Sequence, residues 1–482
     1  MTLDSGICYR ALRARDARFD GRFFVAVSST RIYCRPICTV KPPKRENCRF
    51  FASAAAAESG GYRPCLRCRP ELAPGNASVD ATTRLAQAAA TMLEDRAHDE
   101  EGLEAVASRL GVTDRHLRRA FGAEFGVSPV EFAQTQRLLL AKRLLTDTAL
   151  PVTEVAFASG FGSVRRFNAL FRQRYRLKPG QLRVRRHDGA ASADALQFEL
   201  SFRPPFDWPA VSAFLGARAI AGVESLEGGC YRRTVRIPRD GEDHVGWIAV
   251  EPSAKKPALR VAVSASLVKV LPPVLSRVKA LMDLACNPAE VAQALGALAK
   301  GRHGLRVPGA FDGFEIAVRA ILGQQVTVAG ARTLAGRFAS AFGDPIETLF
   351  AGLSTLFPAA RRIAGLPAGR VARIGMPAAR ARTIVALARA VADGRLDLLP
   401  NADVESTLET LRAIPGIGEW TAQYIAMRAL SWPDAFPHTD LGVMKALGEK
   451  AAKRVLEAGE AWRPWRAYAV MHLWQSLAKE QR

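Results

Sequence analysis

The spacing of apolar residues changes along the chain, and each change predicts a different kind of structure. From about residue 80 to 186, apolar residues recur every three or four positions, as between Leu103 and Leu110, which is typical of amphipathic helices. From 196 to 268, apolar–polar alternation and β-branched runs predict a small sheet. After residue 270, Ala-rich and Leu-rich stretches broken by glycine and proline predict many helices.

Three short segments rich in proline, glycine, serine or arginine interrupt these patterns and predict joints between domains. They are Pro70–Asn76, His187–Ser192 and Gly301–Gly309. We therefore expect a multidomain protein, mainly α-helical with small α+β parts. The predicted domains span residues 1–75, 80–187, 194–300 and 301–482.

Composition limits the class of protein and of partner. Of 482 residues, 49% are hydrophobic and 24% are charged, which excludes a wholly disordered chain. No apolar stretch is long enough for a transmembrane helix, and the N-terminus lacks the apolar segment of a signal peptide, so we expect a cytoplasmic protein. The formal net charge of +22 indicates a polyanionic partner, most often nucleic acid. A G- and C-rich genome would explain the preference for arginine over lysine, but it would not explain the surplus of basic over acidic residues.

The cysteines are concentrated near the N-terminus, where six of the eight precede residue 70. Two short-spaced pairs, Cys34-x3-Cys38 and Cys65-x2-Cys68, are separated by 26 residues. Such pairs close a tetrahedral four-sulfur site, the usual structural zinc arrangement. The alternative is buried or incidental thiols. The cysteines without a paired spacing are expected to be ordinary thiols; they are Cys8, Cys48, Cys230 and Cys286.

Basic residues surround the cysteine pairs. These cations would offset the negative charge of four zinc-bound thiolates and attract phosphate. A zinc-bound thiolate also stays deprotonated at neutral pH and is a nucleophile. The flanking residues are Arg31, Arg35, Arg63, Arg67 and Arg69.

The segments Phe24–Val27, Thr30–Cys38, Arg45–Asn47 and Arg63–Cys68 resemble the N-terminal methyl-acceptor domain of the Ada family of bacterial methylation-response proteins. The resemblance covers about residues 6–72. It implies that Cys34 accepts a methyl group from a methyl phosphotriester in DNA and that all four paired cysteines bind zinc. Methylation would remove one negative charge, so we hypothesise a one-way switch in DNA affinity; the alternative is an inert zinc fold. The resemblance places four residues at the phosphate site: Thr30, Arg45, Arg63 and Arg67.

Two helix-turn-helix patterns follow. In the first, Thr113 is a predicted cap of a helix that turns Leu117 and Phe121 inward. The pattern recurs at 152–171, with Ser163 as the cap. On a recognition helix, the outward side chains contact DNA in the major groove. The outward arginines are Arg115, Arg118, Arg165 and Arg166.

The second pattern, Ala158 to Phe171, together with the tail Lys178-Pro179-x3-Arg183, resembles the AraC-type DNA-binding domain. The resemblance implies sequence-specific binding to promoter DNA. The alternative is a basic helical bundle that binds phosphates without sequence preference.

A glycine turn near residue 416 has a different pattern. The string from Leu411 to Ala422 contains Pro415-Gly416-Ile417-Gly418, which predicts a helix that ends at Pro415 and another that begins near Glu419. Backbone N–H groups after Gly416 and Gly418 are expected to point outward and bind DNA phosphates, and Thr421 belongs to the same predicted DNA-binding motif. The alternative is a plain helix–helix turn.

This turn and the later string Phe436–Gly442 together resemble the helix-hairpin-helix base-excision DNA glycosylases, in particular the bacterial 3-methyladenine DNA glycosylase II of the AlkA type. The resemblance extends over roughly residues 196–482. It implies that Asp440 is catalytic, because a fixed carboxylate stabilises the oxocarbenium charge that develops on the sugar. The alternative is a helix cap, a common role for aspartate.

Residue 420 bears on the type of reaction. Bifunctional glycosylases of this superfamily have a Schiff-base lysine at the position that Trp420 occupies here, so a monofunctional enzyme is expected. Trp420, Tyr424, Trp474 and Phe214 match the residues that surround the damaged base, and an aromatic face attracts a cationic alkylated purine. Core packing is the alternative for each ring.

Two positions depart from the AlkA pattern. The residue that enters the base stack is apolar in the family and is Gln325 here, while Leu441 replaces a tyrosine. Both differences put in doubt the rate of base release or the range of damaged bases that the enzyme accepts.

The combined expectation is a zinc-bound α/β module, a tandem helix-turn-helix bundle, a small sheet domain and a helix-hairpin-helix glycosylase fold. Expected partners are alkylated double-stranded DNA, promoter DNA and RNA polymerase, with no membrane and a monomeric chain. The rival hypothesis is a transcriptional regulator with a weak or inactive glycosylase part.

Overall fold

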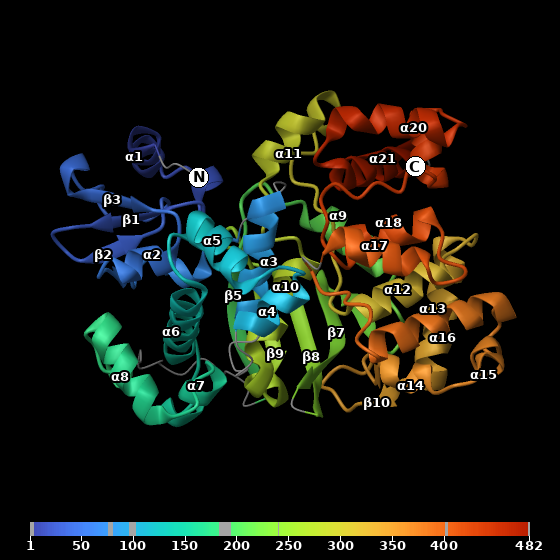
Figure 1. The fold of residues 1–482 in the computed structure, drawn as a ribbon, viewed down its shortest axis with the longest axis horizontal. Coiled ribbons are helices and arrows are strands. Elements are labelled where there is room, and N and C mark those ends of the chain that lie inside the picture. The colour runs from blue at the N-terminus through green and yellow to red at the C-terminus, as the bar shows by residue number, and fades with distance from the viewer. Residues whose placement is uncertain are drawn as a thin grey trace. The chain divides into compact units, whose positions relative to one another are not determined.

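The computed structural model describes residues 4–75, 81–95, 103–182, 194–239, 241–400 and 403–480 (Figure 1). Its contacts divide the chain into two compact units. Unit 1 comprises Met1–Pro204, Pro252–Ser276 and Leu284–Cys286, and unit 2 comprises the remaining residues. Parts of two predicted joints, at Asn76 and His187–Ser192, and Arg183 of the predicted tail motif lie outside the described residues.

Unit 1 begins with a small α/β module. Its four-stranded sheet has the order β3-β1-β2-β4, in which β1 is antiparallel to β2 and β3, while β4 is parallel to β2. Both faces of β1 are buried: Phe24 and Ala26 belong to one apolar cluster with Tyr33, and Val25 belongs to another. The elements are α1 (Ser5–Ala14), β1 (Phe24–Val27), β2 (Ile32–Cys34), β3 (Cys48–Phe51), α2 (Ala54–Ser59) and β4 (Arg63–Pro64).

The helical part of unit 1 confirms the two predicted caps. Thr113 accepts a hydrogen bond from His116 N at the start of α5, and Ser163 accepts one from Arg166 N at the start of α8. The long α6 joins the two halves, and Figure 1 shows α7 and α8 at one end of it. The elements are α3 (Ala81–Asp95), α4 (Leu103–Arg109), α5 (Asp114–Phe125), α6 (Pro129–Asp147), α7 (Val152–Ala158) and α8 (Val164–Tyr175).

The predicted sheet region contains three strand pairings of known register. In unit 1, β5 (Ala195–Ser201) is antiparallel to β9 (Ala258–Ser264). In unit 2, β7 (Cys230–Arg239) is antiparallel to both β6 (Glu224–Glu227) and β8 (Glu242–Pro252). The helix α9 (Trp208–Gly216) interrupts the strands, because Asp207 caps it and Pro209 fits its first turn.

Unit 2 is otherwise mainly helical. Its buried helices present apolar faces to one another, and Ile321, Ile384 and Ile425 are fully buried. Its helices include α12 (Gly313–Leu322), α13 (Val328–Phe342), α16 (Ala378–Ala392), α17 (Val404–Arg412), α18 (Glu419–Arg428), α19 (Leu441–Leu447) and α21 (Arg466–Glu480). The other elements after β9 are α10 (Leu271–Leu281), α11 (Pro288–Leu295), α14 (Ala360–Ala364), α15 (Ala368–Ala372), α20 (Ala452–Gly459) and the short strands β10 (Asp344–Pro345) and β11 (Thr355–Leu356).

Within these described ranges, none of the helices has the length and apolar character required to cross a bilayer.

Candidate functional sites

The four paired cysteines meet in one place. Cys34 ends β2, and Cys65 follows β4, so the parallel pairing of these strands brings the two together. The Sγ atoms of Cys34, Cys38, Cys65 and Cys68 all lie within 4.8 Å of one another. Zinc–sulfur bonds of about 2.3 Å in a tetrahedron place sulfurs about 3.8 Å apart, so this donor set fits zinc.

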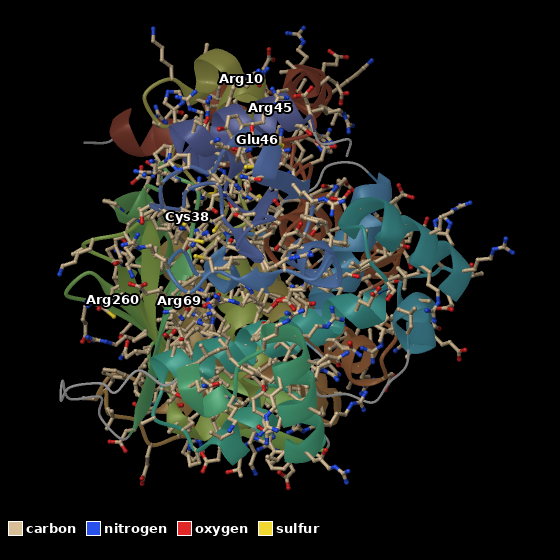
Figure 2. The ribbon with its side chains drawn as sticks, turned by 90° about the vertical axis from the view of Figure 1, so that its left-hand side faces the viewer. Arg10, Cys38, Arg45, Glu46, Arg69 and Arg260 are labelled. Carbon is tan, nitrogen blue, oxygen red and sulfur yellow. The ribbon has the colours of Figure 1, made fainter. Side chains whose placement is uncertain are left out.

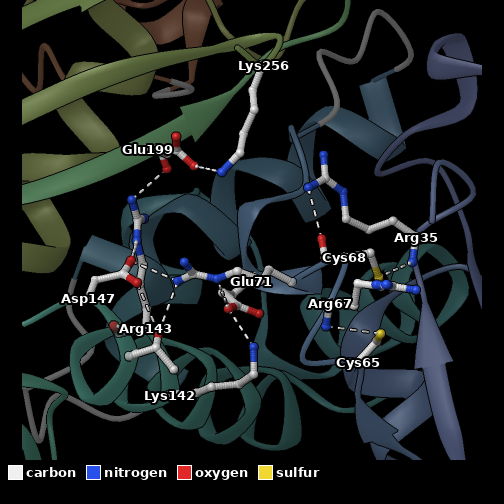
Figure 3. Close-up of polar contacts among 12 residues, drawn as sticks. Arg35, Cys65, Arg67, Cys68, Glu71, Lys142, Arg143, Asp147, Glu199 and Lys256 are labelled. Atoms are coloured by element: carbon white, nitrogen blue, oxygen red, sulfur yellow. Dashed lines mark hydrogen bonds and ion pairs between the residues drawn. The ribbon is translucent and has the colours of Figure 1, made fainter. Parts of the chain in front are cut away.

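Hydrogen bonds distinguish the sulfurs. The backbone N–H of Arg35 donates to Cys68 Sγ at 3.3 Å, and that of Arg67 donates to Cys65 Sγ at 3.4 Å (Figure 3). Each bond withdraws electron density from the sulfur that accepts it. Cys65 and Cys68 are therefore the less nucleophilic sulfurs on electrostatic grounds.

Two of the flanking arginines face the protein instead of a phosphate. The Arg35 guanidinium is buried against Asp20, with Nε 2.8 Å from Oδ1, and Arg35 Nη1 donates to the Cys68 carbonyl at 3.2 Å. Arg69 forms ion pairs with Glu71 at 3.0 Å and Asp147 at 2.8 Å. The expectation that they attract phosphate is wrong for these two, because each charge is already neutralised by a carboxylate.

The predicted phosphate residues are more accessible. Thr30, Arg45 and Arg67 are exposed, and Arg63 is partly exposed. Figure 2 shows Arg45 beside Arg10 and apart from Cys38. The positively charged surface of the α/β module therefore extends beyond the immediate surroundings of the cysteines.

The predicted DNA-facing arginines of the helix-turn-helix part are all exposed. Arg115 and Arg118 lie on the first turns of α5, and Arg165 and Arg166 on the first turn of α8. Arg118 also pairs with Asp114 at 2.8 Å, a helical i,i+4 contact. Their positions suit contact with a groove, since the N-terminal residues of a recognition helix reach the bases.

In unit 2, Asp440 lies at the N-terminus of α19 and faces two indole rings. Its Oδ1 accepts hydrogen bonds from Val443 N at 3.0 Å and from Trp474 Nε1 at 2.9 Å. Its Oδ2 accepts one from Trp420 Nε1 at 2.8 Å. Asp440 thus caps a helix and also belongs to an aromatic site, so the two interpretations of this residue are compatible.

The four predicted substrate-binding rings form one aromatic cluster, defined here as Phe214, Trp420, Tyr424 and Trp474. Trp420 and Tyr424 are stacked with centroids 5.3 Å apart, and Phe214 and Trp474 are nearly parallel at 6.3 Å. Tyr424 and Trp474 complete the cluster at 6.4 Å. All four side chains are partly exposed, unlike rings that only fill a core.

The glycine turn has the expected shape with two differences. The first helix, α17, ends at Arg412, earlier than predicted. The N–H after Gly416 does not point outward, because Ile417 N donates to the Ile414 carbonyl at 3.1 Å within the turn. Gly418 is the N-cap residue before α18, so this helix start has no side-chain cap.

The loop between α12 and α13 is bound to this turn. Gln324 Nε2 donates to the Gly416 carbonyl and to Thr421 Oγ1, both at 2.9 Å. Thr421 is only 2% exposed, so its hydroxyl connects the loop and the hairpin. The next residue, Gln325, is exposed with a positive φ of 55°, and Leu441 is 82% exposed beside Asp440.

Comparison with known proteins accounts for almost the whole chain. Family models match in four places: the metal binding domain of Ada (7–71), a helix-turn-helix domain (106–185), the AlkA N-terminal domain (197–312) and the HhH-GPD superfamily base excision DNA repair protein (318–450). The probable bifunctional transcriptional activator/DNA repair enzyme AlkA of Mycobacterium tuberculosis is 39% identical over 484 residues, which cover 98% of this chain and 96% of the relative. The chain belongs to this AlkA family of bifunctional proteins.

Relatives of separate parts agree with this assignment. DNA-3-methyladenine glycosylase 2 of Escherichia coli is 36% identical over 277 residues, covering 58% of this chain and 96% of the relative. The Ada enzyme of the same organism is 36% identical over 141 residues, covering 29% of this chain and 38% of the relative. The predicted fusion is confirmed: this AlkA-family chain is a DNA-binding repair protein whose four cysteines form one zinc site.

Two groups of residues in this AlkA-family chain escaped the sequence analysis. Arg218 and Arg428 lie on the rings of the aromatic cluster. The signal for them was the spacing: Arg218 follows Phe214 by four residues and Arg428 follows Tyr424 by four, which places each pair on one helical face. The buried carboxylate of Glu58, bound by Tyr33 and Tyr175, gave no signal because its partners are distant in sequence.

Proposed function

We propose that unit 2 is a monofunctional DNA glycosylase that releases alkylated bases such as 3-methyladenine, with Asp440 as its catalytic carboxylate. The observation that carries this proposal is the position of Asp440, fixed by two indole N–H groups and a helix N-terminus at a partly exposed aromatic cluster. Cleavage of the glycosidic bond leaves positive charge on the sugar, and a carboxylate held in place stabilises it without reorganisation.

Trp420 supports the monofunctional type of reaction. Its side chain offers no amine that could form a Schiff base, and its indole N–H is bound to Asp440. The helix-hairpin-helix turn supports DNA as the substrate, with the open space at Gly418 leaving room for a phosphate backbone. Gln325, on the neighbouring exposed loop, is proposed to fill the space left by the flipped nucleotide.

The test is release of free bases from alkylated duplex DNA. Wild-type protein should release 3-methyladenine, and Asp440→Asn should lower the rate by about 100-fold or more, because one preorganised charge is lost. Asp403→Asn is the matched control, since Asp403 caps α17 by a bond to Glu405 N. No release by the wild type, with zinc bound and DNA binding intact, would favour the rival function, a transcriptional regulator with an inactive glycosylase part.

The four-cysteine site supports a second function, a sensor of methyl phosphotriesters, with Cys34 as acceptor. Bound zinc would keep the thiolates deprotonated. Cys34 Sγ forms a bond to the methyl carbon, the carbon–oxygen bond breaks, and the phosphodiester regains its negative charge. Cys34 is favoured over Cys65 and Cys68 because those two sulfurs accept backbone N–H bonds.

Mass spectrometry of protein exposed to methyl phosphotriester DNA tests this assignment. The peptide that contains Cys34 should gain one methyl group, and Cys34→Ser should abolish the gain. Cys48→Ser is the control, because Cys48 is a partly exposed thiol outside the cluster. A methyl group on Cys38, Cys65 or Cys68 in the wild type would contradict the assignment.

The remaining parts of the proposal concern the cellular role. We propose that Arg115, Arg118, Arg165 and Arg166 contact promoter DNA, and that Thr30, Arg45, Arg63 and Arg67 contact DNA phosphates beside the methylated one. We further propose that the chain acts as a monomer in the cytoplasm and contacts RNA polymerase. A gel-shift assay on the protein's own promoter, with and without prior methylation, tests the regulatory part.

A further inference from the structure

A group of buried charges begins at the residue that follows the zinc ligand Cys68. Arg69 has a positive φ of 53°, and its guanidinium pairs with Glu71 at 3.0 Å and with Asp147 at 2.8 Å. The Nζ atom of Lys142 pairs with the same Glu71 oxygen at 2.5 Å (Figure 3). The side chain of Glu71 is 2% exposed and that of Lys142 is 1% exposed. The segment that follows the zinc ligand is therefore joined to α6 by buried ion pairs.

The same charges connect α6 to the strand β5. Arg143 is 4% exposed, and its Nε lies 3.8 Å from Asp147 Oδ2. Its Nη2 donates to the Glu199 carbonyl of β5 at 2.7 Å, and its Cζ is 4.8 Å from the ring centroid of Phe198. Within unit 1, one set of side chains thus links the α/β module, α6 and β5. We call this set the buried charge network; its members are Arg69, Glu71, Lys142, Arg143 and Asp147.

The position of Glu71 decides whether the network can form. Among the described residues, no other carboxylate forms an ion pair with Lys142, and a buried ammonium group without such a partner is strongly unfavourable. Glu71 lies in the short helical turn Pro70–Leu72, which begins two residues after Cys68. Zinc bound to the four cysteines would fix Cys68 and hence the start of this turn. The docking of α6 therefore depends on a segment whose conformation the metal stabilises.

We propose that zinc binding at the four cysteines and docking of the end of α6 on β5 are thermodynamically coupled through the buried charge network. Zinc favours the conformation of the cysteine loop that presents Arg69 and Glu71 to α6. Because the coupling of two equilibria is reciprocal, the network strengthens zinc binding by the same factor by which zinc strengthens docking.

This coupling makes the cysteine site a regulatory device that acts beyond its own module. The network holds the last turns of α6, which ends at Asp147, and the second helix-turn-helix begins at Val152. Loss of the metal would loosen the support of α7 and α8, although no zinc ligand lies on either helix. The inference needs only the zinc site and the contacts of unit 1, and it holds or fails independently of the proposed activities.

Hydrogen exchange of the full-length protein, with zinc bound and after its removal by a chelator, tests the coupling. In the wild type we expect removal of zinc to raise exchange about tenfold at residues 142–147 and 195–201. Lys142→Met lacks the charge that Glu71 holds. Exchange there should already be high with zinc bound, and removal of zinc should raise it by less than about threefold. Glu71→Gln combined with Lys142→Met removes both charges together, so neither is left buried and unpaired, and it should behave in the same way.

Zinc affinity provides the reciprocal measurement. Titration against a competing chelator should show zinc binding about tenfold weaker in both variants than in the wild type. Lys256→Met is the matched control, because it breaks the pair of the exposed Lys256 with the Glu199 carboxylate at 2.6 Å and leaves the network intact. Its zinc affinity and its exchange should equal those of the wild type.

Three outcomes would overturn the inference. The first is exchange at residues 142–147 and 195–201 that does not respond to zinc in the wild type. The second is equal zinc affinity in the wild type and in both variants, which would exclude the reciprocal effect. The third is a rise in exchange that is equally large in α5, which would mean general unfolding of unit 1 instead of a change carried by the network.

Discussion

Tyr175, the last residue of α8, donates its hydroxyl to Oε1 of Glu58 across 3.2 Å. Tyr33 donates to the same oxygen at 3.0 Å, and Tyr33 directly precedes the zinc ligand Cys34 in β2. Glu58 is only 3% exposed. The strand that carries a metal ligand and the second recognition helix therefore meet at one buried carboxyl group.

This carboxyl group should make the stability of unit 1 depend on pH. Burial raises the pKa of Glu58 from 4.5 to about 8, despite the hydrogen bonds of Tyr33 and Tyr175 and the charge of Arg174, which act to lower it. The folded state thus holds the proton more tightly, and stability is full below the unfolded pKa and falls as pH rises from 4.5 to about 8. Hydrogen exchange of β2 and α8 should show this fall in the wild type. Glu58→Gln should flatten the profile, and an equal slope in both proteins would contradict the prediction.

Asp440 should reveal its structural and chemical roles through two different substitutions. Asparagine caps a helix about as well as aspartate, so Asp440→Asn should keep the melting temperature while base release is lost. Alanine removes the cap to Val443 N, so Asp440→Ala should lose activity and also about 1 kcal/mol of stability. Thermal unfolding beside the base-release assay separates the two effects. A clear loss of stability in Asp440→Asn would contradict this division.

Gly416 and Gly418 should respond very differently to the same change. A Cβ at Gly416 would lie 2.2 Å from Thr383 Oγ1, at a φ of +93° that an L residue rarely adopts. Gly416→Ala should therefore lower stability by about 2 kcal/mol and weaken DNA binding, because the turn must distort. A Cβ at Gly418 meets nothing within 4 Å, so Gly418→Ala should stay within about 0.5 kcal/mol of the wild type. Denaturant unfolding and DNA titration provide both readouts.

Methylation of Cys34 should appear in the salt dependence of DNA binding. It removes one negative charge from the four-cysteine site, so one more phosphate is effectively neutralised on binding. The slope of log affinity against log salt concentration should become steeper by about 0.9. Titrations of methylated and unmethylated protein at several salt concentrations measure this slope. Cys34→Ser exposed to the same methylated DNA is the control, and identical slopes for the two wild-type forms would exclude an electrostatic switch.

Short-range features of the fold were predictable because the partners are close in sequence. The caps at Thr113 and Ser163 and the inward positions of Leu117 and Phe121 follow from local helix rules. The cysteine pairs were equally readable, since two short spacings define a metal site. Asp440 became a candidate for catalysis only through the family resemblance, because a cap and a catalytic carboxylate look the same in sequence.

Long-range charge pairing was not predictable. Arg35 lies beside two zinc ligands in the sequence, but its charge is met by Asp20, 15 residues earlier. Arg69 likewise meets Asp147, 78 residues later. A sequence shows that a charge is present, whereas its availability to DNA depends on which carboxylate the fold brings to it.

The two bonds donated by Gln324 hold together two parts of the surface proposed to contact DNA. They join the loop that carries Gln325 to the hairpin at Gly416 and Thr421, so the distance between these two contact regions is a property of the protein. We expect a duplex that contacts both regions in the proposed complex to bend. The cost of that bend depends on the base steps around the lesion and is lowest at flexible pyrimidine–purine steps. We therefore expect the surrounding sequence to affect base release even where the protein contacts no base edge.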